Sequence, residues 1–352
     1  MNAPDFHSLR AYPDARAIEI IDQTQLPHKR VTLRLTDVRE AAHAIRTMQV
    51  RGAPLIGATA AYGLAMALSA DASTDALRAA YDILRATRPT AVNLQWALDR
   101  VRRTVEPLPP PLRRDAAWHE AELIAGEDMA TNRAIGDHGL RLIENFAQKL
   151  RRPVQIMTHC NAGALATLGW GTATAPIYRA HDLGIPMHVW VSETRPRLQG
   201  AKLTAWELRE RGVPHTLIVD AAGASLMQQR RVDLVLVGAD RVAINGDVCN
   251  KIGTYEKALA ASDNGVPMYA AVPSPTIDWT VADGSSIPIE ERAASEVLGD
   301  DESNPSAPCG TAVMNQAFDV TPARLLTGLI TERGICAASA SGLAALFPEH
   351  RR

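Results

Sequence analysis

The sequence contains few cysteines, and they are not closely paired. Only four occur among 352 residues, Cys160, Cys249, Cys309 and Cys336, and no C-x-x-C is present. Disulfide frameworks and zinc knuckles depend on closely spaced cysteine pairs, so neither is predicted. A reducing cytosol is the environment that this cysteine usage favours.

An excess of charge of one sign is also missing. The 37 lysines and arginines nearly balance the 39 acidic residues, which leaves a formal net charge of -2. Without an overall basic field, non-specific binding to nucleic acid or to an anionic membrane is not expected. The N-terminal MNAPDFHSLR lacks the apolar core of a signal peptide, and no uninterrupted apolar stretch approaches the length of a membrane span. We therefore predict a soluble cytoplasmic protein.

The common nucleotide, hydrolase and metal motifs are absent as well. The ten histidines show no H-E-x-x-H, and no G-x-S-x-G, Walker A or G-x-G-x-x-G sequence occurs. These motifs carry zinc proteolysis, serine hydrolysis and the binding of nucleotide phosphates. We predict that the protein needs no metal and no cofactor.

The composition is that of a folded globular chain, with 46% hydrophobic and 22% charged residues, and the length suits two domains. The proline-rich run Glu106–Pro111 cannot lie inside a helix, so it marks a boundary. The predicted division is a mostly helical N-terminal domain over residues 1–113, a linking helix over 114–150, and a catalytic domain over 151–352.

The N-terminal part should open with a small β element and continue as helices. Residues 17–21 and 30–35 read as extended pieces. Asp37 followed by Glu40 resembles a capping box at the start of a helix, and alanine-rich stretches at 57–70, 74–87 and 91–104 predict further helices. A long helical pattern runs from Asp115 to about Leu150.

From Pro153 onward, short apolar runs alternate with helical segments. The runs are VQIMTHC, MHVWVSE, HTLIVDA, VDLVLVGAD, MYAAVP and LLTGLIT. This alternation predicts the α/β class, with a parallel sheet covered by helices on both faces. Ligands of such sheets bind beyond the carboxyl ends of the strands, so the residues that follow each run are the candidates for chemistry.

An anion site is suggested by Arg51, Gly52 and Ala53 in VRGAPLIG, where a cation and a bendable backbone lead into a helix. Backbone N–H groups at a helix N-terminus and a guanidinium can converge on phosphate oxygens. A tight turn with a solvated Arg51 is the alternative interpretation, and the residues alone leave both open.

Cys160 lies where an apolar strand ends, in THCNAGALAT, and we expect a helix to begin there. The dipole of that helix would favour the thiolate form. The alternative is a buried structural cysteine, which is the commoner role of cysteine.

Asp240 closes the most apolar strand of the chain, and partial desolvation there would raise its pKa and suit it to exchange protons. Helix capping or a salt bridge with Arg241 is the alternative. Asn250 and Lys251 follow at the expected start of another helix, as a second phosphate contact. A solvated surface lysine is the alternative for Lys251.

A polar loop over residues 192–204 contains Gln199 and could meet the hydroxyl groups of a polyol. Arg88 is a further candidate cation, with a helix-surface charge as the alternative. An acidic, serine- and proline-containing patch at 299–308 predicts an exposed loop.

Several long motifs together resemble the methylthioribose-1-phosphate isomerases of methionine salvage. They are MxVRGAPLIG, RPTAVNL, NRAIG, THCNAGALAT, ETRPRLQGAKLTAWEL, VGADRVAINGDVCNKIGT and FDVTPARLLTGLIT. The resemblance runs in order from about residue 19 to residue 335. The same superfamily holds ribose-1,5-bisphosphate isomerases and regulatory subunits of translation initiation factor 2B.

The resemblance implies a helical N-terminal domain, a Rossmann-like C-terminal domain, a homodimer, and a site in the cleft between the domains. It implies Cys160 and Asp240 as the catalytic pair. The implied contacts to the substrate and its phosphate are Arg51, Gly52, Ala53, Arg88, Gln199, Asn250 and Lys251. Departures from the family pattern occur at AASEV, after Arg292, and in the 299–308 loop, and neither is expected to touch the site.

The implied reaction moves a carbonyl from C1 to C2 of a pentose whose anomeric oxygen carries phosphate. The phosphate locks the ring, so protonation of the ring oxygen by neutral Asp240 is a sensible first step. Whether hydrogen then moves as a proton or as a hydride stays open, although stabilisation of developing charge is the role we favour for Cys160. The alternatives are an isomerase of ribose 1,5-bisphosphate or 5-deoxyribose 1-phosphate, and a non-catalytic regulatory subunit.

Overall fold

A small antiparallel sheet opens the chain. The computed structural model describes residues 7–299, 306–308 and 310–351. The first sheet consists of β1 (Leu9–Tyr12), β2 (Ala17–Ile21) and β3 (Thr32–Leu35), in the order β1-β2-β3. The strands β2 and β3 confirm the two predicted extended pieces. β1 is an addition, a four-residue strand held through its pairing with β2.

Four helices follow, at the bounds expected to within a few residues. They are α1 (Val38–Arg46), α2 (Ala53–Ala70), α3 (Thr74–Arg85) and α4 (Val92–Val105). Asp37 caps α1 by accepting hydrogen bonds from the N–H groups of Arg39 at 2.7 Å and Glu40 at 2.9 Å. Glu40 accepts from the N–H of Thr36 at 2.6 Å, so the return bond of the capping box reaches one residue further back.

The helix α2 is the centre of the helical part. Its 18 residues are apolar and long enough to cross a membrane by length and composition, contrary to the expectation that no such stretch exists. Within the structure 72% of this stretch is buried, mainly against α4 and α5. Burial of that kind is typical of the core helix of a globular protein.

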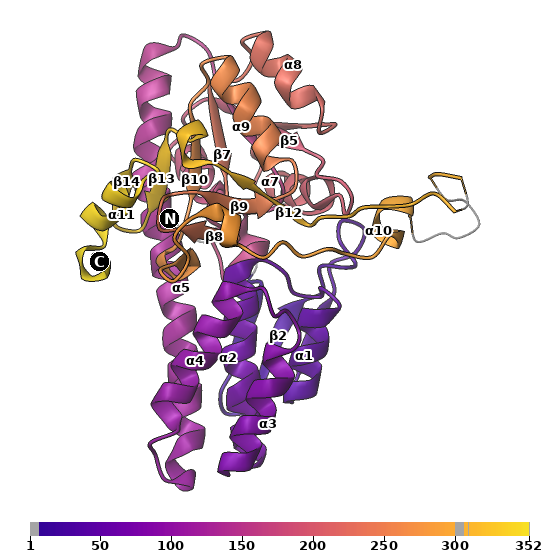
Figure 1. Cartoon of the computed structure of the whole chain (residues 1–352), viewed down its shortest axis with the longest axis vertical. Helices are drawn as coiled ribbons and strands as arrows, with labels where there is room; N and C mark the ends of the chain where they lie inside the picture. Colours follow the sequence, from indigo (N-terminus) through magenta and orange to yellow (C-terminus); the bar gives the residue numbers. More distant parts are fainter. Residues whose placement is uncertain (1–6, 300–305, 309, 352) are drawn as a thin grey trace.

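The longest helix, α5 (Pro110–Lys149), runs from the helical part to the large sheet (Figure 1). It begins five residues before the predicted start at Asp115, because proline is well tolerated in the first turn of a helix. Its first buried residues, including Trp118 and Ile124, join the core of the helical part. Ile135 and Ile143 join the core beneath the large sheet.

The large sheet has seven strands in the order β14-β13-β10-β7-β4-β5-β6. They are β4 (Val154–Thr158), β5 (Met187–Ser192), β6 (His215–Ile218), β7 (Leu234–Val237), β10 (Met268–Ala271), β13 (Gly328–Thr331) and β14 (Gly334–Cys336). The six predicted apolar runs supply the six parallel strands. Only β14 is antiparallel and was not predicted.

Helices cover both faces of this sheet, which confirms the predicted α/β class. Alternate strand residues point to opposite faces, so Leu234 packs in one core and Val235 in another. The first core includes α6 (Thr174–Asp182), α7 (Ala205–Glu210) and residues of α5. The second includes α8 (Ala222–Gln228), α9 (Thr254–Asp263) and α11 (Ala340–Leu346).

A third sheet, in the order β11-β8-β9-β12, was not predicted. It consists of β8 (Arg241–Ala243), β9 (Val248–Lys251), β11 (Ile277–Asp278) and β12 (Phe318–Thr321). The short helix α10 (Ser295–Leu298) lies on an arm that extends from this sheet (Figure 1). Most of the loop predicted over residues 299–308 lies outside the described residues.

Candidate active site

The nine residues predicted from the sequence all border two adjoining cavities, which together we call the site cavity. Arg51, Gly52, Ala53, Cys160 and Asp240 border both cavities. Arg88, Gln199 and Lys251 line the first cavity, and Asn250 lines the second. The site cavity therefore joins the starts of α2 and α4 to the carboxyl ends of β4, β5, β7 and β9.

The side chain of Arg51 lies inside the protein, with a residue exposure of 8%. One terminal nitrogen donates to the backbone carbonyl of Asn161 at 2.8 Å, and the other donates to the side-chain oxygen of Asn161. Its Nε is buried without a hydrogen-bond partner. The interpretation of Arg51 as a solvated charge is therefore wrong. Its buried Nε–H, which lacks an acceptor, favours the binding of an anion.

Gly52 permits α2 to begin against the segment that follows β4. Its φ is +92°, and a Cβ at this position would lie 2.5 Å from the Cα of Ala166. The first N–H groups of α2 have no partner within the helix, and Ala53 carries one of them at the cavity wall. The predicted combination of a cation and a helix N-terminus is thus present.

Arg88 lies between α3 and α4, and it is not a helix-surface charge. Its terminal nitrogen lies 3.0 Å from a carboxylate oxygen of Glu290, while its Nε is buried without a partner. Arg51 and Arg88 therefore each bring an unsatisfied guanidinium donor to the site.

Cys160 is fixed by its backbone at the end of β4. Its φ of +63° is unusual for a residue with a side chain. Its N–H donates to Thr194 Oγ1 at 2.8 Å, its carbonyl accepts from Thr204 Oγ1 at 2.6 Å, and its Sγ lies 3.4 Å from Gln199 Oε1. The thiol is buried, and Cys160 lines the site cavity.

The prediction that a helix begins at Cys160 is wrong. Only a short 3-10 turn, Ala164–Ala166, follows, so no helix dipole acts on the sulfur. Burial raises the pKa of Cys160, and the negative charge of Asp240 raises it further, against the opposing effects of Arg51 and Lys251. Cys160 is therefore a neutral thiol near pH 7 rather than a thiolate.

Asp240 lies between β7 and β8, with part of its surface open to the site cavity. Burial raises the pKa of Asp240, against the lowering effects of nearby cations, as the sequence predicted. The alternative of a salt bridge with Arg241 is wrong, because Arg241 pairs with Asp278 at 3.2 Å and donates to the carbonyl of Thr90 at 2.6 Å.

Lys251 ends the strand β9, whereas a helix start was expected. The helix α9 begins three residues later, at Thr254, after Gly253. The Lys251 Nζ lies 4.4 Å from the ring centroid of Phe318. Burial lowers the pKa of Lys251, while Cys160 and Asp240 raise it. Lys251 is thus a sheltered cation facing the proposed catalytic pair, not a solvated one.

Sequence reasoning missed the buried carboxylate that supports this side of the cavity. Glu207 has no exposed surface and accepts hydrogen bonds from Asn161 Nδ2 at 2.8 Å and Tyr178 Oη at 2.7 Å. It also accepts from the N–H groups of Ala164 at 2.7 Å and Leu165 at 3.0 Å. Since Asn161 holds Arg51, Glu207 positions the anion site indirectly. Both residues lie within the recognised motifs, but their pairing cannot be read from the sequence.

A row of charged residues along the cavity was also missed. Arg197 and Arg292 line the site cavity, and both pair with Glu296, at 2.8 Å and 2.9 Å. Glu296 belongs to the AASEV segment, which therefore contacts two arginines of the cavity wall, although none of its own residues lines the site cavity. In the sequence, the only sign of this row of charged residues is the run from Glu290 to Arg292.

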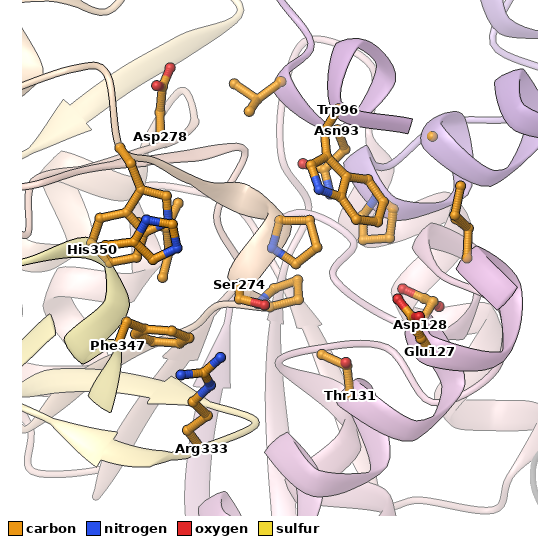
Figure 2. A pocket seen from close by; sticks show the side chains of 18 of the residues that line it. Asn93, Trp96, Glu127, Asp128, Thr131, Ser274, Asp278, Arg333, Phe347 and His350 are labelled. Carbon is orange, nitrogen blue, oxygen red and sulfur yellow. The ribbon is translucent and has the colours of Figure 1, made fainter. Parts of the chain in front are cut away.

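A larger cavity of about 400 Å³ contains none of the nine predicted residues (Figure 2). It lies between α4 and α5 on one side and the C-terminal residues on the other. Glu127 and Asp128 lie side by side on α5, below Trp96, and His350 stacks on Trp279. Pro54 and Pro273 border both this cavity and the site cavity. Within the described part of the chain, no group of three or more His, Cys, Asp or Glu side chains could hold a metal ion.

Comparison with known proteins identifies the family. Residues 49–338 match the model of the initiation factor 2 subunit family. The methylthioribose-1-phosphate isomerase of Dechloromonas aromatica is 59% identical over 353 residues, covering 98% of this chain and 97% of the relative.

Two solved structures show the same fold. The 5-methylthioribose 1-phosphate isomerase of Pyrococcus horikoshii superposes with a TM-score of 0.86 at 40% identity, covering 97% of this chain and 96% of the other. The translation initiation factor eIF-2B subunit delta from A. fulgidus gives 0.82 at 36% identity, covering 98% and 100%. Likeness of fold therefore extends to a protein that carries the name of a translation initiation factor subunit.

Proposed function

The chain belongs to the initiation factor 2 subunit family, and within it we propose an aldose-ketose isomerase that converts 5-methylthioribose 1-phosphate to 5-methylthioribulose 1-phosphate. The identity of 59% over nearly the full length with an isomerase of that name supports this function. The observation that carries the chemistry is that Cys160 and Asp240 face one cavity with Arg51 and Lys251. Such a reaction places the protein in methionine salvage.

The phosphate is assigned to the Arg51 end of the cavity. The supporting features are the unpaired Nε of Arg51, the unpaired Nε of Arg88, and the N-terminus of α2 at Gly52 and Ala53. Charge-assisted bonds from guanidinium groups to phosphate are among the stronger hydrogen bonds in proteins. Lys251 adds a further positive charge, and Asn250 and Gln199 add polar contacts for the hydroxyl groups.

Asp240 is assigned the acid–base role. Its raised pKa favours the neutral form that can protonate the ring oxygen. The bond between C1 and the ring oxygen then breaks, and hydrogen moves from C2 to C1. The hydroxyl on C2 becomes the carbonyl and returns its proton to Asp240, so the enzyme ends the cycle unchanged.

Cys160 is assigned a supporting role rather than that of a base. A buried neutral thiol is poorly suited to remove a proton from carbon, because the thiolate is the reactive form. A hydride shift from C2 to C1 needs no additional base. The thiol instead contacts the reacting carbons and limits the access of water to the charge that develops on them.

The alternative substrate with a second phosphate is less well suited to this cavity. Apolar side chains form part of the wall, namely Met48, Ile56, Ile287 and Phe318. An apolar wall fits a methylthio group better than a phosphate. The remaining cations of the wall already have carboxylate partners, since Arg197 and Arg292 pair with Glu296 and Arg241 pairs with Asp278.

Direct assay tests the function. Purified protein should convert methylthioribose 1-phosphate to the ketose, followed by NMR, and should convert ribose 1,5-bisphosphate much more slowly. In deuterated water a hydride shift leaves the new C1 hydrogen unlabelled. The absence of ketose formation from either sugar would refute the isomerase assignment.

Two substitutions test the catalytic pair. Asp240→Asn and Cys160→Ser should each lower kcat by roughly 10²–10⁴-fold, as expected for loss of a group acting in the transition state, while the circular dichroism spectrum stays unchanged. Arg209→Ala, on the exposed surface of α7, is the matched control and should retain full activity. A folded Asp240→Asn enzyme with an unchanged rate would remove Asp240 from the mechanism.

We further propose that the enzyme works as a cytoplasmic homodimer. The three described cysteines, Cys160, Cys249 and Cys336, are free thiols, as suits a reducing compartment. Light scattering coupled to size-exclusion chromatography would measure the mass of the assembly.

A further inference from the structure

Five charged side chains form a continuous row of ion pairs, and the three arginines of this row line the site cavity. Arg88 pairs with Glu290 at 3.0 Å, and Glu290 pairs with Arg292 at 2.8 Å. Arg292 pairs with Glu296 at 2.9 Å, and Glu296 pairs with Arg197 at 2.8 Å. Both carboxylates come from residues 290–296, whereas Arg88 comes from the helical part of the chain. Glu290 therefore links the two parts of the protein at the site.

The cations of the cavity fall into two classes. Six line it, namely Arg51, Arg88, Arg197, Arg241, Lys251 and Arg292. Four of these form an ion pair with a carboxylate of Glu290, Glu296 or Asp278. Within the described residues, Arg51 and Lys251 form no such ion pair. Arg88 is intermediate, because Glu290 holds one of its terminal nitrogens while its Nε has no hydrogen-bond partner.

The space in the cavity also requires a rearrangement. The larger of its two parts measures about 60 Å³, whereas small-molecule pockets commonly measure about 300–1,000 Å³. Side chains at the wall must therefore move when a sugar phosphate enters. The ion pair of Arg88 and Glu290 is mostly buried, with side-chain exposures of 13% and 22%. Water therefore screens the Arg88 guanidinium only partly, and a substrate phosphate competes with Glu290 for it.

We propose that Glu290 is a positioning residue that occupies the Arg88 guanidinium in the unliganded protein and yields it to the phosphate of the substrate. A phosphate dianion carries more charge than one carboxylate, so it displaces Glu290. The carboxylate keeps Arg88 in place, lowers the affinity for anions in general, and takes Arg88 back when product leaves. This inference rests on the proposed function only in placing a phosphate in this cavity.

Titration calorimetry with inorganic phosphate tests it. Glu290→Gln should lower the Kd for phosphate by about three- to tenfold, since it removes a competing charge without changing the shape of the side chain. Added salt should reduce the difference. With the sugar phosphate, KM should fall and kcat should not rise. Glu349→Gln removes a carboxylate that pairs with Arg333 outside the site cavity, and it should leave phosphate binding unchanged.

Two further variants isolate the route through Arg88. In an Arg88→Met background, Glu290→Gln should change the Kd less than it does in the wild type. Glu290→Asp keeps the charge but shortens the side chain, so it should tighten binding less than Glu290→Gln and serves if the latter fails to fold.

Each outcome is decisive. A folded Glu290→Gln protein that binds phosphate as the wild type does, or more weakly, overturns this inference alone. A wild-type protein that binds no phosphate overturns both this inference and the phosphate assignment on which it rests.

Discussion

At the scale of single residues, burial in the site disfavours the charged forms of Cys160, Asp240 and Lys251 alike. Burial raises the pKa values of Cys160 and Asp240 and lowers that of Lys251. Near neutral pH the arrangement favours a neutral thiol and extends the neutral form of the carboxyl group to higher pH. This suits the protonation of a ring oxygen better than the removal of a proton from carbon.

The pH dependence of kcat should report the neutral form of Asp240. The group is protonated below its pKa, so kcat should be constant at low pH and fall about tenfold per unit once pH exceeds that raised pKa. Lys251 loses its charge at higher pH, and KM should rise as it does. Both profiles can be measured by NMR assay.

The control is the residual activity of Asp240→Asn, which should lack this fall in kcat. If the same fall persists in the variant, another group is responsible for it.

The residue scale also shows what a sequence motif conceals. THCNAGALAT indicated a helix at Cys160, yet the residue adopts a φ of +63° and only a 3-10 turn follows. The conformation depends on Thr194 and Thr204, which bind the backbone of Cys160 from another segment. Contacts between segments of this kind are not encoded in local propensity.

At the scale of secondary-structure elements, the long and apolar ones were predictable. Six strands of the large sheet and the helices α1 to α4 follow from periodicity and capping. The third sheet was missed because β8 has three residues and β11 has two, too few to give a pattern. These short strands form only through tertiary pairing, yet β8 follows Asp240 directly and pairs with β9, the strand that ends at Lys251.

The start of α2 depends on glycine at position 52. Gly52→Ala should lower the free energy of unfolding by on the order of 2–4 kcal/mol, because it combines an unfavourable φ with overlap of the Ala166 backbone. It should also weaken phosphate binding. Denaturant unfolding and calorimetry measure the two effects.

Gly126→Ala, within α5, is the matched control, because a Cβ there would contact nothing within 4 Å. It should raise the free energy of unfolding slightly, by about 0.5–1 kcal/mol. Equal stability of the two variants would show that Gly52 is not required for its conformation.

At the scale of the whole molecule, the site belongs to both parts of the chain. Arg51 and Arg88 come from the helical part, whereas Asp240 lies between β7 and β8 and Lys251 ends β9. The motifs indicated these residues, but the row from Glu290 to Arg197 required the assembled structure. The proposed boundaries at residues 113 and 150 stay a prediction, since α5 packs in both cores.

Ligand binding should therefore stabilise the molecule as one unit. Phosphate at about 100 times its Kd should add about 2.7 kcal/mol to the free energy of unfolding, and Tm should rise by several degrees in a single transition. Differential scanning calorimetry measures this. Arg51→Ala should abolish the shift, whereas Arg209→Ala should preserve it. A shift confined to one of two separate transitions would contradict a site built from both parts.

The helix α5 has a consequence for how the cleft can widen. The two ends of this 40-residue helix pack in different cores, and between them none of residues 125–131 is buried. Gly126, the least helix-favouring residue of that stretch, has open space around it. A tilt of the helical end from the sheet at this point would have to disrupt polar contacts, since Asp128 accepts a hydrogen bond from the N–H of Leu168 at 2.9 Å and Glu127 pairs with Arg100.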